Sequence, residues 1–375
     1  MKISIGIHGD GDCKGGLYNM LASFSLGLHK GLTTQTEPVK YVYEYLQAMS
    51  APHIAIAFNV IGYNIWDELI KFGTKNIMWT VDSPFHQNIS VYEKYKDSQG
   101  FASFAVSPSD IEAMKLFFPN IPYFYIPHGT DPDIWQPDDS GEEKEHDIVF
   151  LGSIRDSEQN FADLKEKLDK NIYKLLMNIY DFAMQNPDKS FWEIYNLAAD
   201  QYGFERDNLQ LYIFLFQNVC YNITDARRVK LIESLNGLGV KVWGNAIWQK
   251  YIKEDAQYMG SAELFEAAKI VRKSKIVLHL QPMQIINGFH ERIFNATASG
   301  SFLLASHQKN FEESFGDKIG YYKLNNIAGV AERAQYLLAN NDEREAKAKA
   351  AREITLQNHT WESRAKEILN LIKVE

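Results

Sequence analysis

The sequence has few of the features that mark secreted, membrane-bound or redox-active proteins. Only two of its 375 residues are cysteines, Cys13 and Cys220, and they lack the close spacing of a metal or redox pair. Two distant cysteines do not suggest a disulfide framework and favour a reducing compartment. No apolar run approaches the roughly 18 residues of a membrane-spanning helix, and the N-terminal run is too short for a signal peptide. We therefore expect a cytoplasmic protein without an integral membrane segment.

An excess of positive charge is also missing. The chain carries 39 Lys and Arg against 48 Asp and Glu, a formal net charge of −9. Such a balance disfavours general binding to nucleic acids or anionic membranes, so we expect no nucleic-acid partner. An anionic ligand would have to be held by a few local cations, which gives single Arg and His residues more weight. No metal-ligand spacing stands out, and we expect neither a metal nor another cofactor.

The alternation of strands and helices predicts an α/β fold. At 375 residues the chain is too long for one ordinary core, and two domains of roughly 150 to 200 residues are expected. Short apolar runs alternate with helical patterns, which predicts parallel sheets covered on both faces. The predicted strands span residues 2–7, 54–58, 77–81, 101–106, 123–126, 147–153, 240–244, 276–280, 302–305 and 321–324.

Residues 127–133 lead into a polar, turn-rich stretch at residues 137–146, and together they indicate a linker between the domains. We predict Rossmann-like domains at residues 1–137 and 138–358, facing one another across a cleft. Residues 157–222 have a helical, aromatic-rich pattern that indicates an inserted helical segment. Residues 359–375 are amphipathic and begin with a capping pattern, so this helix could cross back onto the first domain.

The segment from Gly288 to Ala305 carries the strongest sign of a ligand site. It follows a predicted strand, opens a short helix with His290 and Arg292 in its first turn, and stops that helix at Gly300. First-turn amides lack intrahelical partners and the helix dipole is positive there, so the junction suits an anion. An ordinary crossover helix with solvated charges is the alternative. Because parallel α/β sheets bind ligands at the carboxyl ends of their strands, we predict a phosphorylated ligand here.

A second candidate follows the predicted strand 147–153. Gly152 would let the backbone approach a ligand, Ser153 comes next, and Arg155 could clamp a diphosphate. The alternative is a turn that carries a surface arginine.

The glycine-rich stretch 9–16 follows the first predicted strand but matches neither a dinucleotide nor an ATP motif. Asp10 and Asp12 would repel phosphate, so Gly11 and Asp12 are predicted to face an acceptor rather than a donor. Asp82 ends another strand, at an edge where a general base could take a proton from an acceptor hydroxyl. It could equally cap the following turn. Asp82 is our first choice for the base and His86 our second.

From Asp147 to its end the sequence resembles the second domain of two-domain GT-B glycosyltransferases, in particular the spore-maturation-protein (CgeB-like) type. That type carries Arg-x-Phe-Glu-Ala-x-Ala-x-Gly-x-Phe-Leu-Leu, which stands here as Arg292-Ile-Phe-Asn-Ala-Thr-Ala-Ser-Gly-Ser-Phe-Leu-Leu304. Val242–Trp248 and His359–Arg364 also resemble its motifs. The first domain is similar only in general pattern.

The resemblance implies a hexosyltransferase-like enzyme that moves a sugar from a nucleotide sugar to a hydroxyl of a protein or glycan, without a metal. Arg292 and the helix amides would stabilise the leaving phosphate. His128 would line the acceptor side. The residues implied in donor binding are Gly152, Ser153, Arg155, Gly244, Asn245, His279, Gly288, His290, Glu291 and Asn295.

Asn295 departs from the family pattern, which has Glu at that position. An amide can still hydrogen-bond a diol, but without charge assistance. The change leaves donor identity and stereochemical outcome open. It also keeps two alternatives: a nucleotide-sugar epimerase on the same fold, and a non-catalytic partner that binds a sugar or glycoprotein.

Overall fold

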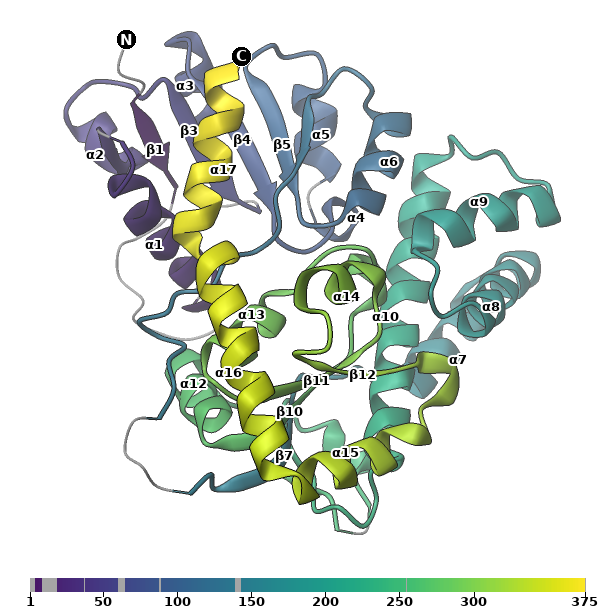
Figure 1. Ribbon diagram of the computed structural model, residues 1–375. Coiled ribbons are helices and arrows are strands. Elements are labelled where there is room, and N and C mark those ends of the chain that lie inside the picture. The colour runs from purple at the N-terminus through teal and green to yellow at the C-terminus, as the bar shows by residue number, and fades with distance from the viewer. Residues whose placement is uncertain are drawn as a thin grey trace. The chain divides into compact units, whose positions relative to one another are not determined.

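The computed structural model describes residues 4–8, 19–36, 38–59, 65–87, 89–138, 143–253 and 255–374. The chain forms two compact units, each with a six-stranded sheet flanked by helices (Figure 1). The first unit combines Met1–Asp131 with Gly288–Glu291 and Gln357–Glu375, and the second contains Pro132–Asn287 and Arg292–Leu356. The predicted α/β class with two Rossmann-like domains is confirmed.

All strand pairs of the first sheet are parallel, in the order β2-β1-β3-β4-β5-β6. Every residue of the central strands β3 and β5 is buried, as expected for strands covered on both faces. Strand β2 was not predicted, because it is three residues long and its middle residue, Lys40, is exposed. The strands are β1 (Ile5–Ile7), β2 (Val39–Tyr41), β3 (Ile54–Phe58), β4 (Lys75–Thr80), β5 (Phe101–Ala105) and β6 (Tyr123–Tyr125).

The C-terminal helix of the chain belongs to the first unit, where it lies beside α1 (Figure 1). A methyl group at Gly27 or Gly31 of α1 would collide with Trp361, so these glycines permit the close approach of the two helices. The helices of this unit are α1 (Asn19–Thr33), α2 (Val42–Gln47), α3 (Trp66–Lys71), α4 (Pro84–Gln87), α5 (Ile89–Tyr95), α6 (Pro108–Phe117) and α17 (Trp361–Val374).

The second sheet is also parallel and has the order β12-β11-β10-β7-β8-β9. Counted from β7 this is the 3-2-1-4-5-6 order of a doubly wound nucleotide-binding fold. In Figure 1 its strands lie between α12 and α10. The strands are β7 (His146–Leu151), β8 (Lys241–Trp243), β9 (Gln257–Tyr258), β10 (Ser274–His279), β11 (Phe302–Ser306) and β12 (Gly320–Tyr322).

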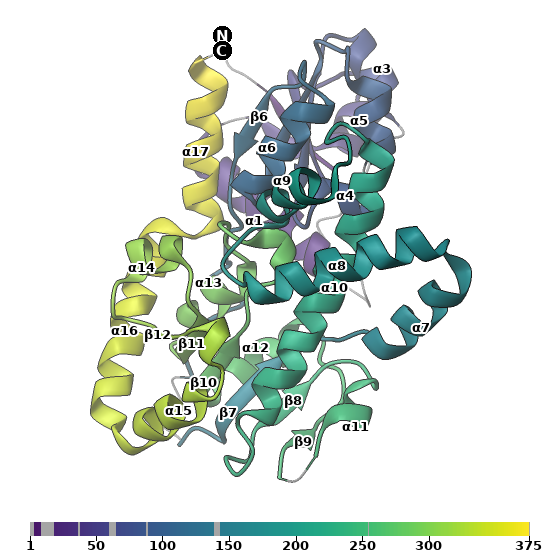
Figure 2. The ribbon, with the colours of Figure 1, turned by 90° about the vertical axis from the view of Figure 1, so that its right-hand side faces the viewer.

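Four helices separate β7 from β8, and three of them project from the second unit (Figure 2). Ser190 starts α9 with a reciprocal capping box, and Gly203 ends it in the left-handed conformation. Helix α10 runs without a break past residue 222, so the predicted insertion ends inside a helix. These four helices are α7 (Ser157–Lys167), α8 (Lys170–Gln185), α9 (Phe191–Tyr202) and α10 (Leu209–Glu233).

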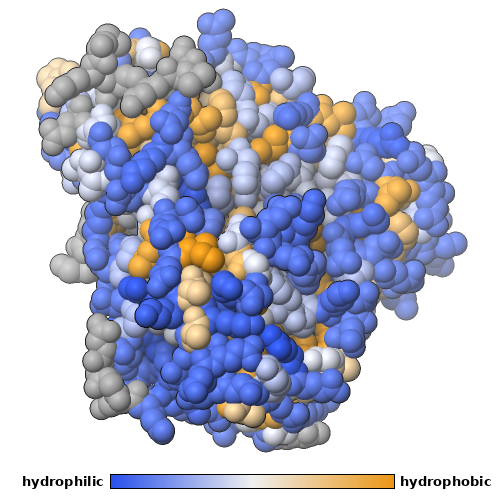
Figure 3. Space-filling view, in the orientation of Figure 1, coloured by the Kyte–Doolittle hydropathy of each residue, from blue (hydrophilic) through white to orange (hydrophobic). Residues whose placement is uncertain are grey.

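The remaining helices cover the rest of the second sheet. Helix α16 carries many charged residues, and the surface over it is largely hydrophilic in Figure 3. No helix in the described ranges is both long and apolar enough to cross a membrane. The helices are α11 (Trp248–Tyr251), α12 (Leu264–Arg272), α13 (Glu291–Ala298), α14 (Lys309–Phe315), α15 (Gly329–Ala339) and α16 (Asn341–Asn358), with short 3-10 turns η3 (Met283–Ile285) and η4 (Leu324–Asn326).

The units divide between Asp131 and Pro132, within the predicted linker and before the predicted domain boundary at residue 137. Residues after Pro132 pack against the second unit, where Arg272 donates to the carbonyl oxygen of Ile134 at 3.1 Å. Lys273 and Asp138 lie 3.6 Å apart in the same unit. The segment Gly288–Glu291, which we had placed in the second domain, groups with the first unit.

Candidate functional site

The carboxyl ends of β7 and β10 mark the place where the strand order of the second sheet reverses. Strands β7 and β10 are direct neighbours, while the chain continues from β7 to β8 on one side and from β10 to β11 on the other. Loops that leave such a switch point in opposite directions open a crevice where doubly wound folds bind ligands. The loop after β7, residues 152–156, is therefore the first place to examine.

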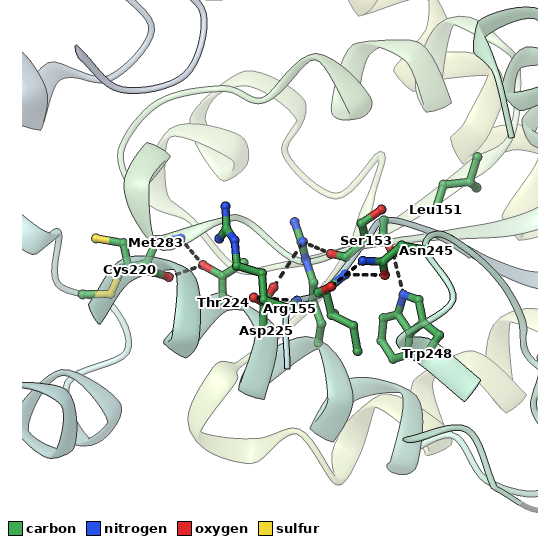
Figure 4. Close-up of polar contacts among 12 residues, drawn as sticks. Leu151, Ser153, Arg155, Cys220, Thr224, Asp225, Asn245, Trp248 and Met283 are labelled. Carbon is green, nitrogen blue, oxygen red and sulfur yellow. Dashed lines mark hydrogen bonds and ion pairs between the residues drawn. The ribbon is translucent and has the colours of Figure 1, made fainter. Parts of the chain in front are cut away.

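Two side chains from elsewhere, those of Trp248 and Asn245, fix the backbone of this loop (Figure 4). Trp248 Nε1 donates to the carbonyl oxygen of Gly152 at 2.6 Å. The Asn245 side chain accepts from the amide of Ile154 at 3.2 Å and donates to its carbonyl oxygen at 2.7 Å. A methyl group at Gly244 would collide with the carbonyl oxygen of Gly152. Gly244 and Asn245 thus shape the loop, and their predicted contact with a nucleobase remains a prediction.

Two arginines from other elements contact the loop, and a third belongs to it. Arg292 of α13 donates from Nη1 to the carbonyl oxygen of Leu151 at 2.9 Å. Arg228 of α10 donates from Nη1 to the carbonyl oxygen of Ser153 at 2.5 Å. The exposed Arg155 guanidinium stacks 3.7 Å from the centre of the Tyr221 ring. We call Arg155, Arg228 and Arg292 the arginine cluster.

The cluster is electrostatically crowded. Burial lowers the pKa of Arg228 to about 10, and the positive charges of Arg292 and Arg155 act in the same direction. Asp225 opposes them, with its Oδ1 3.7 Å from Arg228 Nη1, while its Oδ2 accepts from the Arg155 amide at 3.0 Å. Burial raises the pKa of Asp225, which weakens its compensating charge. An arriving anion would relieve this repulsion, and guanidinium groups match the oxygens of a phosphate.

Arg228 and Asp225 were not identified from the sequence. They lie within the long helix α10, in a stretch whose pattern gave only a helix. The one available signal was the Arg227-Arg228 pair in an otherwise apolar helical region.

The predicted donor residue His279 lies in the interior. Its ring is buried, with Nε2 2.9 Å from the side-chain oxygen of Gln281. Asn295 is likewise buried in α13. Both side chains are buried in this structure, and their predicted contact with the donor remains a prediction.

The start of α13 is shared between the two units. The helix begins at Glu291, so His290 precedes its first turn rather than lying in it. Gly288, His290 and Glu291 belong to the first unit, where His290 Nδ1 lies 2.8 Å from a Glu291 carboxyl oxygen. All three are buried. Their predicted contacts with a donor remain a prediction.

In the first unit, His128 is buried and both of its ring nitrogens are engaged. Nδ1 lies 2.8 Å from the carbonyl oxygen of Phe289, and Nε2 lies 2.8 Å from that of Val81. Arg364 donates to the backbone oxygen of His128 at 2.8 Å. The ring therefore joins segments of its own unit, and its predicted place beside an acceptor remains a prediction.

The predicted base candidates lie at the carboxyl edge of the first sheet. Asp82 follows β4 and is exposed, and His86 in α4 is half-buried. Behind them lies the buried Asp110 of α6, which sequence reasoning missed because Asp in a first helical turn is ordinary. Burial holds the pKa of Asp110 well above its usual value, and the charge of Asp82 adds to that effect. Burial thus separates Asp110 from the exposed Asp82, which is accessible to an acceptor hydroxyl.

The switch point of the first sheet lies between β1 and β3. Gly11 and Asp12, predicted to face an acceptor, fall outside the described residues. His8, which precedes that stretch, is buried and accepts from Trp66 Nε1 at 3.3 Å. Burial lowers its pKa to about 4, so it is a neutral hydrogen-bonding group at neutral pH. Within the described ranges no group of acidic, His or Cys side chains is arranged to hold a metal ion; metal independence remains a prediction.

Residues 227–370 match a family model described as glycosyl transferase-like. This range includes Arg228, Arg292 and α13, but neither the first sheet nor α7 to α9. No curated protein matches the sequence.

Solved structures resemble the whole chain. Sucrose-phosphate synthase from Thermosynechococcus elongatus is 10% identical, with a TM-score of 0.54 over 99% of this chain and 97% of that one. An α-glucosyltransferase in complex with UDP and a DNA 13-mer containing an HMU base is 13% identical, with a TM-score of 0.54 over the full length of both. HepE from Anabaena, in complex with UDP-glucose, is 12% identical, with a TM-score of 0.53 over the full length of both. These similarities establish the GT-B fold; together with the family match they support a glycosyltransferase.

Proposed function

We propose that the protein is a glycosyltransferase that moves a sugar from a nucleotide-sugar donor to a hydroxyl group of a protein or glycan. The observation that carries the proposal is the arginine cluster around the loop after β7. It lies at the switch point of a GT-B second unit, and two of its members fall within the matched range 227–370. The CgeB-like type and a cytoplasmic location are part of the same proposal.

The donor diphosphate binds at the arginine cluster. Arg155 is part of the loop after β7, Arg292 reaches this loop from α13, which follows β10, and Arg228 reaches it from α10. When the bond between the anomeric carbon and the phosphate oxygen breaks, negative charge grows on the leaving nucleoside diphosphate. Fixed guanidinium groups stabilise that charge without reorganising during the reaction. This is the role a divalent cation would otherwise fill, so the proposed reaction needs no metal.

The acceptor hydroxyl is activated in the first unit. Asp82 is exposed and takes the proton as the acceptor oxygen bonds to the anomeric carbon. The pKa of the buried Asp110 is raised by its burial, so this carboxyl is less suited to carry a charge beside the base. His86 is the second choice for the base.

The relatives suggest which donors to test first. HepE is described in complex with UDP-glucose, and the α-glucosyltransferase in complex with UDP. We therefore propose a UDP-sugar, with a hexose as the sugar, as the first donor to examine.

The test is to incubate the purified protein with UDP-, GDP-, dTDP- and CMP-sugars and to measure release of the free nucleotide, with and without candidate glycan acceptors. Release that depends on Arg292 supports the proposal. Conversion of the donor sugar without nucleotide release would instead indicate an epimerase. Tight donor binding without any turnover would indicate a non-catalytic sugar-binding protein.

A further inference from the structure

The second unit contains a pocket of about 530 Å³ between α7, α8, α10 and α11. Its volume falls in the range of small-molecule sites. Two of its walls come from the inserted helices, so the insertion gives the pocket its depth. No role has so far been assigned to this insertion.

The pocket has an apolar, aromatic floor. Phe161 of α7 and Tyr180 of α8 meet edge to face with ring centres 5.0 Å apart. Tyr251 lines the opposite side, and Val229 of α10 lies between. All four side chains are half-buried, so their surfaces are still available to a ligand. Aromatic rings arranged in this way suit a planar, weakly polar group such as a nucleobase.

The rim carries uncompensated positive charge. Lys250 is neutralised by Asp156 at 3.0 Å and Glu158 at 2.8 Å. In contrast, Arg155, Lys230 and Lys253 have no carboxylate of the described residues within ion-pair distance. The pocket is lined by four cations, Arg155, Lys230, Lys250 and Lys253, and by three carboxylates, Glu158, Asp225 and Glu233, which leaves one positive charge in excess. The balance favours an anionic ligand.

The pocket adjoins the arginine cluster. Arg155 and Asp225 line the pocket and also form the loop site after β7. By contrast, the predicted base-binding position at Gly244 and Asn245 is filled by the loop backbone and by Trp248. A ligand with a phosphate at Arg155 and a planar group beyond it would therefore extend beneath the insertion.

We propose that this pocket holds a nucleoside phosphate, with its base against Phe161, Tyr180 and Tyr251 and its phosphate directed to Arg155. The nucleoside phosphate is either the nucleotide half of the sugar donor, in which case the inference rests on the proposed function, or a separate nucleotide. In both cases the insertion is the element that recognises the nucleoside.

The test compares nucleotides with inorganic diphosphate by isothermal titration calorimetry. UDP, GDP, dTDP, CMP and inorganic diphosphate are titrated into the wild-type protein and into Ala226→Phe, which places a ring in the pocket from α10. We expect the best wild-type nucleotide to bind about tenfold or more tightly than diphosphate, and the variant to lose that advantage while its diphosphate affinity stays unchanged. Equal nucleotide affinity in both proteins overturns the proposal.

A second set of variants changes the charge of the pocket and tests the proposal even if Ala226→Phe does not fold. Lys230→Glu combined with Lys253→Glu should weaken nucleotide binding about tenfold, whereas Lys174→Glu, an exposed position of α8 outside the pocket, should change it less than about twofold. Unchanged binding in the double variant counts against the pocket.

The binding stoichiometry and the donor KM distinguish the nucleotide half of the sugar donor from a separate nucleotide. One nucleotide per chain, with a raised donor KM in Ala226→Phe, identifies the donor. Two nucleotides per chain, with one lost in the variant and donor KM unchanged, identifies a separate nucleotide. Failure of the proposed function looks different, because the wild-type protein would then transfer no sugar from any donor even if nucleotides bind in the pocket.

Discussion

The Nη1 atom of Arg292 lies 2.9 Å from the carbonyl oxygen of Leu151, the last residue of β7. This hydrogen bond joins the helix that follows β10 to the end of the neighbouring strand, across the switch point of the second sheet. It orients the guanidinium over the loop that carries Gly152 and Arg155. A methyl group at Gly152 would come within 3.1 Å of Arg292 Nη1, so the glycine leaves space for the side chain.

Replacing Arg292 with Ala should reduce sugar transfer by about 100- to 1,000-fold, because one preorganised donor to the leaving phosphate is lost. The fold should persist, since the arginine is only half-buried. Steady-state rates of nucleotide release provide the measurement. Arg206→Ala, which removes an exposed arginine paired with Asp200, is the control and should retain full activity. Unchanged turnover in Arg292→Ala would refute the phosphate assignment.

Replacing Arg228 with Met should destabilise the ligand-free protein. The substitution leaves the buried Asp225 without the cation that lies 3.7 Å from its Oδ1, and a buried charge without its partner is costly. Nucleotide binding should weaken. Thermal unfolding with and without the nucleotide panel tests both parts: we expect a lower melting temperature without ligand and a smaller increase caused by nucleotide. An intact nucleotide-dependent increase would contradict the role given to Arg228.

Asp110→Asn should stabilise the protein at neutral pH and have little effect near pH 4. The folded state raises the pKa of this carboxyl, so between the unfolded and folded pKa values the folded protein binds more protons than the unfolded chain. Stability contributed by the protonated form is therefore present at low pH and lost as the pH rises. An amide, which never ionises, removes this loss. Each kcal/mol gained should raise the melting temperature by about 2–4 °C, measurable by calorimetry from pH 4 to pH 8.

Asp82→Asn provides the comparison for that variant. Asp82 is exposed, so the substitution should barely change the melting temperature. If Asp82 is the base, transfer should fall by about 100-fold or more, while nucleotide affinity stays the same. Full activity in Asp82→Asn would move the assignment to His86.

Trp361→Ala should destabilise the first unit by about 3–5 kcal/mol, the usual cost of deleting a large buried ring. The Trp361 ring lies 5.2 Å from that of Phe24, 6.0 Å from Phe58 and 5.7 Å from Trp79, measured between centres. Urea unfolding followed by circular dichroism measures the change. The neighbouring Glu362 is exposed, and Glu362→Ala should have little effect. A similar small effect for Trp361→Ala would show that α17 is not part of this core.

Periodic patterns were enough to predict most of the fold. The predicted strand 54–58 coincides with β3, and 302–305 lies within β11, because long apolar runs can only be buried in a covered sheet. The short strands β2 and β9, of three and two residues, were missed since they contain no such run.

Residues of the candidate site could be predicted only where they closely follow a predicted strand in the sequence. Arg292 and Arg155 follow predicted strands and could be identified. Arg228, in contrast, donates a hydrogen bond to Ser153, which lies 75 positions earlier in the sequence. The burial of His128 was equally hidden, because its two carbonyl partners at Val81 and Phe289 lie 47 and 161 positions away. No local sequence pattern predicts contacts between residues that are this far apart in the sequence.

The placement of Trp361 has a consequence for how the protein is made. The ring completes the core of the first unit, yet the ribosome reaches it only after synthesising all of Pro132–Asn287 and Arg292–Leu356. Domains usually fold as units in the order in which they emerge. Here the N-terminal sheet must wait for residues near the C-terminus, so the second unit is the first that can reach its final packing during translation. A truncated gene encoding only residues 1–131 would yield a core with an open face where Trp361 belongs.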